Sequence, residues 1–280
     1  MKAIATILAV LGLCSCSARV VDQARAGAPA HRIVSLMPSL TEDLCAIGAR
    51  EQLAGVSVYS EDIGKCTSGV PVVANFTSID TERVVQLRPD VVIGIPSQAA
   101  MSEPLRRAGI RTAFFKADSY RDLFDDIAAL GALSGHSSQA QTLAATLRKR
   151  TNELRASEHF KRRPNVFFVI QAIPIWTVGP QSYITTLIEF AGGRNAVRSL
   201  PRAYAQYSPE ALVRLQPDVI VATKEARLET LLTREPWRSL RAVREHHVFI
   251  LTDDSIVVRP GPRYNEGLQW LIERFRGVST

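Results

Sequence analysis

Glu82-Arg-Val-Val-Gln-Leu-Arg-Pro-Asp-Val-Val-Ile93 and Glu210-Ala-Leu-Val-Arg-Leu-Gln-Pro-Asp-Val-Ile-Val221 are two copies of one pattern, and they decide the fold. Six of their twelve positions are identical, and several others exchange one aliphatic residue for another. Each copy predicts a short helix, a Pro-Asp turn and an apolar strand, because proline ends a helix and a β-branched run favours a strand buried on both faces. Asp80 and Ser208 stand where the two helices begin and are suited to cap them.

The residues around the two copies repeat as well. Strands are expected at residues 32–37 and 165–171, each followed by a helix, at 38–46 and 182–191 respectively. Helices are expected at residues 104–108 and 237–243, each followed by a strand, at 112–115 and 248–251 respectively. Strands that alternate with helices indicate parallel α/β sheets. The sequence therefore predicts an α/β protein of two similar lobes, each with a parallel sheet flanked by helices.

A single long helix is predicted between the lobes, over residues 137–160. Its apolar residues fall on one helical face, and they are Ala140, Leu143, Ala144, Leu147 and Leu154. Its Ala, Leu, Arg and Glu content also favours a helix. We expect this rigid helix to join an N-terminal lobe, residues 31–136, to a C-terminal lobe, residues 161–280. Such a connection predicts only limited opening and closing.

The N-terminal residues have the features of an export signal. A positive charge precedes the apolar run of residues 3–13, which is too short to span a bilayer. Leu13-Cys-Ser-Cys16 resembles a bacterial lipobox, which implies removal of residues 1–15, lipidation of Cys16 and a tether over residues 16–30. An ordinary signal peptide without a lipid is the alternative. No later stretch is long and apolar enough for a membrane helix, so we expect a periplasmic protein that a lipid anchor alone holds to a membrane.

The net charge of +7 is spread along the chain. Its densest clusters, residues 148–150 and 161–163, lie on and after the predicted long helix without interleaved aromatic residues. This pattern and the export signal argue against nucleic-acid binding. Attraction to anionic lipid or to an acidic ligand stays open.

Two cysteines remain after the leader and the proposed anchor. Cys45 and Cys66 both lie in the first third of the chain. In an oxidising compartment two such thiols often form a disulfide, which we expect here. Two buried free cysteines are the alternative.

The whole arrangement resembles the periplasmic binding proteins with a helical backbone, class III, which serve ABC importers of vitamin B12, haem and ferric siderophores. The likeness rests on Arg32-Ile-Val-Ser-Leu-Met-Pro-Ser-Leu-Thr-Glu42, on the two repeat copies and on Arg259-Pro-Gly-Pro-Arg263. Residues 171–179 (Gln-Ala-Ile-Pro-Ile-Trp-Thr-Val-Gly) and 192–195 (Gly-Gly-Arg-Asn) are similar to the vitamin B12-binding branch. The resemblance covers residues 32–275. It implies a binding protein that captures a corrinoid between its lobes and delivers it to a permease dimer with ATPase subunits; we expect it to act as a monomer.

Ligands of parallel α/β sheets bind beyond the carboxyl ends of the strands. The candidate ligand residues at those ends are Ser39, Tyr59, Phe76, Pro96, Trp176, Tyr204, Asp253 and Arg259. Flat aromatic faces suit a bulky ring system, and in the vitamin B12-binding branch aromatic residues occupy positions that match Tyr59, Phe76, Trp176 and Tyr204. Some of these aromatics could instead seal the core of a lobe. Because Ile95-Pro96 offers no aromatic where that branch can carry one, haem or a ferric siderophore is the alternative ligand.

Glu82 and Glu210 begin the two repeat copies at the same register. A carboxylate in the first turn stabilises a helix through its dipole, by about 0.3–1 kcal/mol. In the family resembled, a glutamate on each lobe pairs with arginines on the two permease subunits. We therefore expect Glu82 and Glu210 to dock the permease, since two similar lobes would present two similar charges to a two-fold symmetric partner.

No signature of catalysis or of a resident metal stands out. The five histidines fall mostly at the wrong ends of the predicted sheets to converge as ligands, so neither a metal nor another cofactor is expected. No nucleophile elbow, phosphate-binding loop or dinucleotide fingerprint is present. The protein is therefore predicted not to be an enzyme, with an exported cofactor-processing enzyme or a sensory binding lobe as alternatives.

Overall fold

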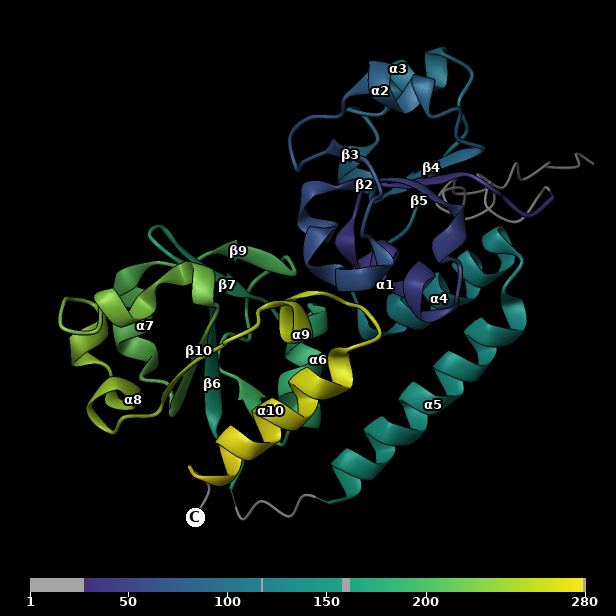
Figure 1. Ribbon diagram of the computed structural model, residues 1–280. Coiled ribbons are helices and arrows are strands. Elements are labelled where there is room, and N and C mark those ends of the chain that lie inside the picture. Colours follow the sequence, from purple (N-terminus) through teal and green to yellow (C-terminus); the bar gives the residue numbers. More distant parts are fainter. Residues whose placement is uncertain (1–27, 117, 158–161, 279–280) are drawn as a thin grey trace, which may run out of the picture.

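The computed structural model describes residues 28–116, 118–157 and 162–278. Two sheets flanked by helices form two lobes, and the helix α5 (Ser137–Ala156) runs from the N-terminal lobe toward the start of the C-terminal lobe (Figure 1). Twenty residues make this helix about 30 Å long. The predicted leader, residues 1–15, and the anchor Cys16 lie outside the described residues.

The N-terminal lobe contains a five-stranded parallel sheet in the order β3-β2-β1-β4-β5. Its strands are β1 (Ile33–Ser35), β2 (Leu53–Ser57), β3 (Val72–Ala74), β4 (Val91–Gly94) and β5 (Thr112–Phe114). Its helices are α1 (Pro38–Ala46), η1 (Arg50–Gln52), η2 (Val58–Cys66), α2 (Thr81–Gln86), η3 (Pro96–Gln98), α3 (Glu103–Arg107) and α4 (Tyr120–Ser134). This lobe has the parallel α/β arrangement that the sequence predicts.

The C-terminal lobe contains a six-stranded sheet in which β11-β10-β6 are parallel, and at one edge β7 pairs antiparallel with β6 and β9 pairs antiparallel with β7. Its strands are β6 (Asn165–Ala172), β7 (Ile175–Val178), β8 (Arg194–Asn195), β9 (Tyr204–Gln206), β10 (Val219–Ala222) and β11 (Val248–Ile250). Its helices are α6 (Tyr183–Phe190), α7 (Pro209–Leu215), η4 (Lys224–Ala226), η5 (Leu228–Thr230), η6 (Trp237–Ser239), α8 (Arg241–Arg244), α9 (Ser255–Val258) and α10 (Tyr264–Arg276). The reversed strand β7 is a difference from the purely parallel sheet expected, because the chain turns back directly after β6 instead of crossing over through a helix.

One predicted helix is divided in two. Residues 237–243 form the short helices η6 and α8, which are separated at Leu240. The backbone of Leu240 is extended, with φ −78° and ψ 140°. A continuous helix is therefore interrupted at this position.

The two copies of the repeat fold alike. The side chains of Asp80 and Ser208 accept hydrogen bonds from the backbone N–H groups of Arg83 and Ala211, each at 3.0 Å, so both predicted caps are confirmed. Figure 1 shows α2 and α7 on the outer sides of their sheets.

The loop after each of these helices also repeats in detail. Arg88 and Gln216 occupy equivalent positions and both adopt the left-handed conformation, with φ 47° and 43°. Two residues later, the carboxylates of Asp90 and Asp218 accept backbone hydrogen bonds from Arg32 at 2.9 Å and Asn165 at 2.8 Å. Each Pro-Asp turn therefore ties its strand to the neighbouring strand at the lobe's centre.

The buried apolar residues in the described part of the chain form three hydrophobic clusters. One covers the outer face of the N-terminal sheet beneath α2 and α3, and a second covers the outer face of the C-terminal sheet beneath α7 and α8. The third, which we call the interlobe core, contains buried residues of both lobes and of α5, among them Leu44, Ile127, Leu147, Leu187 and Leu271. The lobes thus share one continuous core on the side of α5.

A hydrogen-bonded group reinforces this shared core. The hydroxyl groups of Tyr120 on α4 and Tyr264 on α10 share a hydrogen bond of 3.1 Å, and Tyr264 also contacts the hydroxyl of Thr151 on α5.

Across the described residues, no helix is both long and apolar enough to cross a bilayer.

Candidate functional site

Two exposed aromatic rings stack on each other in the N-terminal lobe. Tyr59 is the second residue of η2, and Phe76 follows two residues after the end of β3. Their ring centroids lie 4.2 Å apart with an interplanar angle of 31°. Although aromatic rings are usually buried, these two side chains are 43% and 54% exposed. The structure therefore brings together, beyond the carboxyl ends of two strands, a pair that we call the aromatic shelf.

The two aromatic residues predicted for the C-terminal lobe share one face of its sheet. Trp176 lies on β7 and Tyr204 on the neighbouring β9. In the antiparallel register Val178 is opposite Tyr204, so Trp176 and Tyr204 are one diagonal step apart on the same face. Both are half-buried. Burial, with a smaller contribution from Asp118, raises the pKa of Tyr204 to about 12, so its phenol stays protonated.

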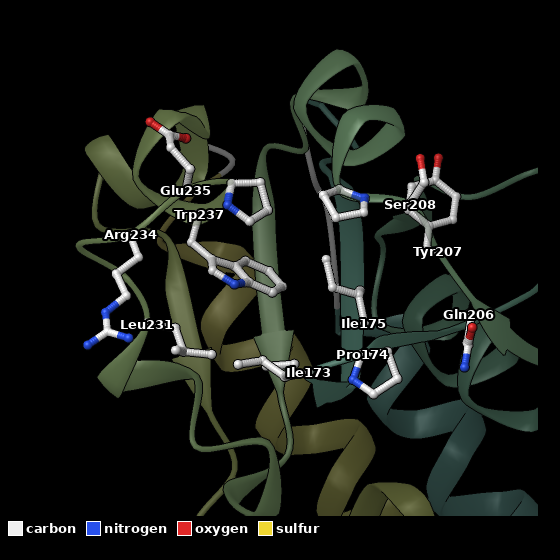
Figure 2. A pocket seen from close by; sticks show the side chains of 13 residues that line it. Ile173, Pro174, Ile175, Gln206, Tyr207, Ser208, Leu231, Arg234, Glu235 and Trp237 are labelled. Atoms are coloured by element: carbon white, nitrogen blue, oxygen red, sulfur yellow. The ribbon is translucent and has the colours of Figure 1, made fainter.

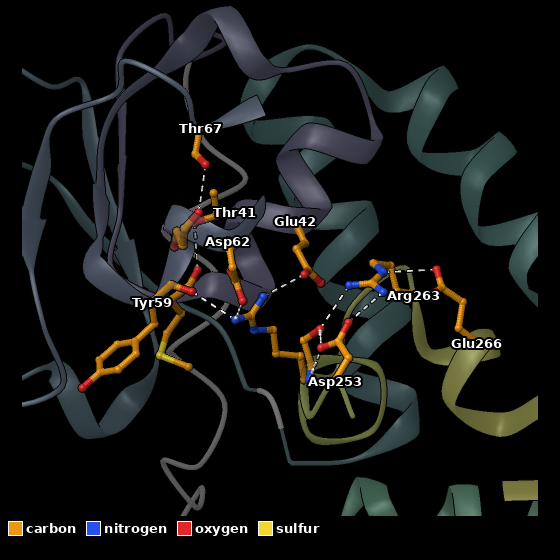
Figure 3. Close-up of polar contacts among 12 residues, drawn as sticks. Thr41, Glu42, Tyr59, Asp62, Thr67, Asp253, Arg263 and Glu266 are labelled. Atoms are coloured by element: carbon orange, nitrogen blue, oxygen red, sulfur yellow. Dashed lines mark hydrogen bonds and ion pairs between the residues drawn. The ribbon is translucent and has the colours of Figure 1, made fainter. Parts of the chain in front are cut away.

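Arg259 connects the C-terminal lobe to the N-terminal lobe through Glu42, Tyr59 and Asp62, which are labelled in Figure 3. Its guanidinium donates hydrogen bonds to Glu42 Oε1 at 2.8 Å, to Asp62 Oδ2 at 2.7 Å and to the carbonyl oxygen of Tyr59 at 3.0 Å. The side chain of Arg259 is 16% exposed and that of Glu42 only 5%. This predicted ligand residue therefore already has partners, and it positions the segment that carries the aromatic shelf. We call these contacts the Arg259 clasp.

The sequence around Arg259 explains why the clasp is tight. A Cβ atom on Gly261 would lie 2.8 Å from Glu42 Oε2, so only glycine allows this close approach. Burial raises the pKa of Glu42, and the charge and hydrogen bonds of Arg259 oppose that rise. Arg259 thus supplies the positive charge that a buried carboxylate requires.

Asp253 is paired within its own lobe. It accepts hydrogen bonds from Ser255 and, at 3.0 Å, from the guanidinium of Arg263 (Figure 3). Partial burial would raise the pKa of Asp253, but these hydrogen bonds outweigh it and lower the pKa. Asp253 is therefore an ionised carboxylate beside the clasp.

The remaining predicted ligand residues differ in accessibility. Pro96 is exposed at the first position of η3, after β4. Ser39 is only 1% exposed, and its hydroxyl is buried without a hydrogen-bond partner among the described residues. A ligand could reach Ser39 only after a rearrangement of α1.

A disulfide joins Cys45 near the end of α1 to Cys66 at the end of η2, as predicted. Their Cα atoms are 6.0 Å apart. The segment η2 also carries Tyr59 and Asp62, so it is fixed covalently at its end and by the Arg259 clasp near its start. The aromatic shelf therefore stands on a constrained segment.

Glu82 and Glu210 both lie in the first turn of their helices, α2 and α7. Both side chains are exposed, and neither makes an ion pair with another residue in the part of the chain that the structure describes. Two free carboxylates thus occupy equivalent places on the outer sides of the two lobes.

A buried acidic pair lies in the N-terminal lobe. Asp43 on α1 is 1% exposed, and both of its carboxylate oxygens are buried without a hydrogen-bond partner among the described residues. Burial, and then the neighbouring Asp126, raises the pKa of Asp43 far above its usual range. Burial likewise raises the pKa of Asp126 to about 8.

Within residues 28–116, 118–157 and 162–278, no three His, Cys, Asp or Glu side chains are placed to hold a metal ion.

The partners of Arg259 were the main feature that the sequence did not reveal. Glu42 stands within the opening segment that carries the family resemblance, yet it lies 217 residues before Arg259. A pairing over such a distance leaves no local pattern. The only signal was that both residues fall in the two segments, 32–42 and 259–263, that the resemblance singled out.

Comparison with known proteins agrees with this geometry. The chain is 29% identical over 255 residues to a vitamin B12-binding protein of Vibrio parahaemolyticus, covering 90% of this chain and 92% of that protein. It is 28% identical to an uncharacterized ABC transporter substrate-binding lipoprotein of Bacillus subtilis, covering 86% and 79%. A solved periplasmic haem-binding protein from Pseudomonas aeruginosa has the same fold, with a TM-score of 0.78 and 26% identity over 90% of this chain and 94% of that one.

A protein family as a whole also matches most of the chain. Residues 33–255 match the periplasmic binding proteins, and the two lobes with their single connecting helix have the class III form of that fold. The family binds ligands and does not convert them, so the expectation that the protein is not an enzyme is confirmed. The chain belongs to the periplasmic binding protein family.

Proposed function

We propose that this ABC substrate-binding protein captures a corrinoid, a vitamin B12-like ring system, between its lobes. The observation that carries the proposal is the aromatic shelf, because Tyr59 and Phe76 stack at 4.2 Å while they remain 43% and 54% exposed. Exposed, preorganised rings offer a large flat surface at low entropic cost. Trp176 and Tyr204 would supply a second aromatic surface from the other lobe.

Arg259 would be the polar partner of the ligand. A guanidinium has five N–H donors, and the Arg259 clasp uses three of them, so two are without a partner among the described residues and could serve a ligand. Asp253, held ionised by Ser255 and Arg263, stands nearby as an acceptor. A ligand with both hydrogen-bond acceptors and donors around a flat ring fits this combination.

Two sets of relatives support different ligands. The relative from Vibrio parahaemolyticus is a vitamin B12-binding protein, which favours the corrinoid. The solved structure from Pseudomonas aeruginosa is a haem-binding protein of the same fold, so haem is the second candidate. The resemblance found in the sequence adds ferric siderophores as a third.

Calorimetry on the purified mature protein would separate these ligands. Cyanocobalamin and cobinamide should each produce a saturable heat of binding, while haem and a ferric siderophore should neither bind tightly nor displace them. Tight binding of haem or of a siderophore, with no heat from either corrinoid, would overturn the corrinoid assignment and leave the binding-protein assignment intact.

We also propose that Glu82 and Glu210 dock the protein onto an ABC permease dimer with ATPase subunits. Both are exposed, lack an ion pair with the described residues and begin equivalent helices on the two lobes. Two carboxylates so placed match a partner that presents two cationic groups related by two-fold symmetry.

Lipidation of Cys16 would hold the protein near the membrane that contains the permease, as the name of the Bacillus subtilis relative suggests. Mass spectrometry of the mature N-terminus would test the lipid.

A further inference from the structure

A cavity of about 590 Å³ lies in the C-terminal lobe, away from the aromatic shelf. It is bounded by the turn between β6 and β7, by the start of α7 and by residues 231–237 (Figure 2). Its apolar walls are formed by Ile173, Pro174, Ile175, Leu231, Pro236 and Trp237. In Figure 2 Ile173 and Leu231 lie beside the Trp237 ring, while Arg234 and Glu235 extend away from it. The cavity is therefore mainly apolar, with Gln206, Tyr207 and Ser208 on one side and two charged residues on the other side of its rim.

This cavity is separate from the proposed corrinoid surface. Successive side chains of a strand point to opposite faces, so Ile175 and Trp176 of β7 face opposite sides of the sheet. Ile175 packs in the outer hydrophobic cluster together with Trp237. Trp176 lies on the other face with Tyr204. A molecule held by the aromatic residues would thus not fill this cavity.

Five large apolar side chains are exposed among the described residues, and three of them lie at or beside the aromatic shelf. Val58, Tyr59 and Phe76 belong to the aromatic shelf or adjoin it, and only Val85 and Ile173 lie elsewhere. A single exposed aliphatic residue is ordinary on a protein surface. The positions of these two are the informative feature.

Both of the remaining aliphatic residues adjoin a proposed docking glutamate. Val85 follows Glu82 by three residues on α2, so the two share a helix face. Ile173 is 71% exposed and lines the cavity together with Pro209, the residue directly before Glu210. The N-terminal lobe therefore presents a free carboxylate beside an exposed aliphatic side chain, and in the C-terminal lobe the cavity that Ile173 lines extends to the residue before the free carboxylate of Glu210.

We propose that the cavity beside Glu210 receives an apolar side chain of the permease, which projects next to the cation that pairs with Glu210. This inference rests on the docking role proposed above and names the second chemical element of the same contact. Charge pairing at Glu210 would fix the orientation of the partner, and burial of an apolar side chain against Ile173 and Trp237 would supply affinity. In the N-terminal lobe Val85 gives Glu82 a smaller apolar neighbour.

A small molecule is the competing occupant, because the volume falls within the range of about 300–1,000 Å³ that ligand sites have. Substitutions at the rim separate the two. Ile173 is exposed, so Ile173→Ser should fold normally. Binding of the full mature protein to its nanodisc-embedded permease–ATPase complex is the measurement, with corrinoid affinity recorded for the same samples. Ala145→Ser, on the exposed face of α5, is the control.

We expect Ile173→Ser to weaken docking by about tenfold, with corrinoid affinity unchanged, and Ala145→Ser to have no effect. The defect of Glu210→Gln should shrink at high salt, since an exposed ion pair is screened, whereas the defect of Ile173→Ser should persist. A photo-crosslinker at position 173 should couple to a permease subunit.

Three results would count against the inference in different ways. If Glu210→Gln weakens docking and Ile173→Ser does not, the cavity is not part of the contact and the docking role of the glutamates survives. If Ile173→Ser lowers corrinoid affinity with docking intact, the cavity belongs to a ligand site. If wild-type protein docks and neither substitution matters, both the inference and the proposed docking face are wrong.

Discussion

The backbone carbonyl of Tyr59 accepts a hydrogen bond of 3.0 Å from the guanidinium of Arg259, a residue two hundred positions later in the other lobe. The same guanidinium neutralises the buried Glu42 and reaches Asp62. One side chain therefore links the lobes and fixes the backbone beneath an exposed ring. Its removal should affect both stability and binding.

Arg259→Gln should lower the free energy of unfolding by about 3 kcal/mol, because it leaves the carboxylate of Glu42 buried without its cation. Corrinoid affinity should fall by about tenfold, since the Tyr59 segment must then be ordered on binding. Chemical denaturation and calorimetry give the two values. Arg263→Gln is the matched control, because its partners Asp253 and Glu266 are about half exposed and such pairs contribute at most about 1 kcal/mol. Equal stability losses in both variants would show that the clasp has no special role.

Trp176→Ala should reduce corrinoid affinity by at least about 2 kcal/mol, as truncation of a central aromatic residue does in other interfaces. Trp270→Ala removes the same side chain from α10, where it packs partly buried against the interlobe core and beneath Arg274. That control should change stability but not affinity. Calorimetry with cyanocobalamin measures both. Unaltered affinity in Trp176→Ala would place this side chain among the residues that seal the lobe.

Glu82→Gln and Glu210→Gln should each weaken stimulation of the transporter's ATPase, and the double variant should do so more strongly. Neither change should alter corrinoid affinity, and each should lower the melting temperature by at most about 4 °C, because both side chains are exposed, lack ion pairs with the described residues and stabilise only their own helices. Glu153→Gln, an exposed carboxylate on α5, provides the control. A folded double variant that stimulates and transports like wild type would reduce both glutamates to helix-start carboxylates worth about 0.3–1 kcal/mol each.

Unfolded, unreduced mature protein should contain no titratable thiol at positions 45 and 66. Replacing both cysteines by serine should lower the free energy of unfolding by about 3 kcal/mol in the chain-entropy model of a loop of this length. Because the disulfide ends η2, corrinoid affinity should fall as well. Two reactive thiols in the unreduced wild type would contradict the bond.

Stability should decrease as the pH rises from about 4 toward 8. The folded state raises the pKa of Asp126 to about 8, whereas the unfolded chain has the ordinary value near 3.9. Between these values the folded state binds more protons than the unfolded state, so the slope of unfolding free energy with pH is negative. Asp126→Asn should flatten this slope and stabilise the protein most near pH 8, while Glu153→Gln should leave the slope unchanged. Denaturation midpoints across this pH range test it, and an unaltered slope in Asp126→Asn would show that another group is responsible.

The sequence predicted correctly those elements of the fold that are determined by neighbouring residues. The caps Asp80 and Ser208, the Pro-Asp turns and the long helix each depend on residues close together in sequence. The antiparallel strand β7 was missed because it is only four residues long and follows Pro174 directly, which leaves no alternation to recognise. The short helices around Leu240 were missed for a similar reason, since a single extended residue interrupts an otherwise helical pattern.

The site was predictable in its residue types and not in its contacts. Tyr59 and Phe76 could be placed beyond strand ends, but their stacking depends on how η2 and the loop after β3 approach each other. Ser39 was predicted as a ligand residue because it also lies beyond a strand end, yet the packing of α1 buries it. The cavity near Trp237 combines three segments from different parts of the lobe, so no single stretch of sequence indicates it.

The interlobe core has a consequence for how the chain folds and can be divided. Buried residues such as Leu147 and Leu271 belong to the same cluster as Leu44 of the other lobe. Separating the halves at α5 would therefore expose apolar surface on both fragments, and neither half of this internal duplication should be stable alone. The whole chain should instead denature in one cooperative transition. Although its two lobes carry copies of one sequence pattern, the chain should therefore behave as a single thermodynamic domain.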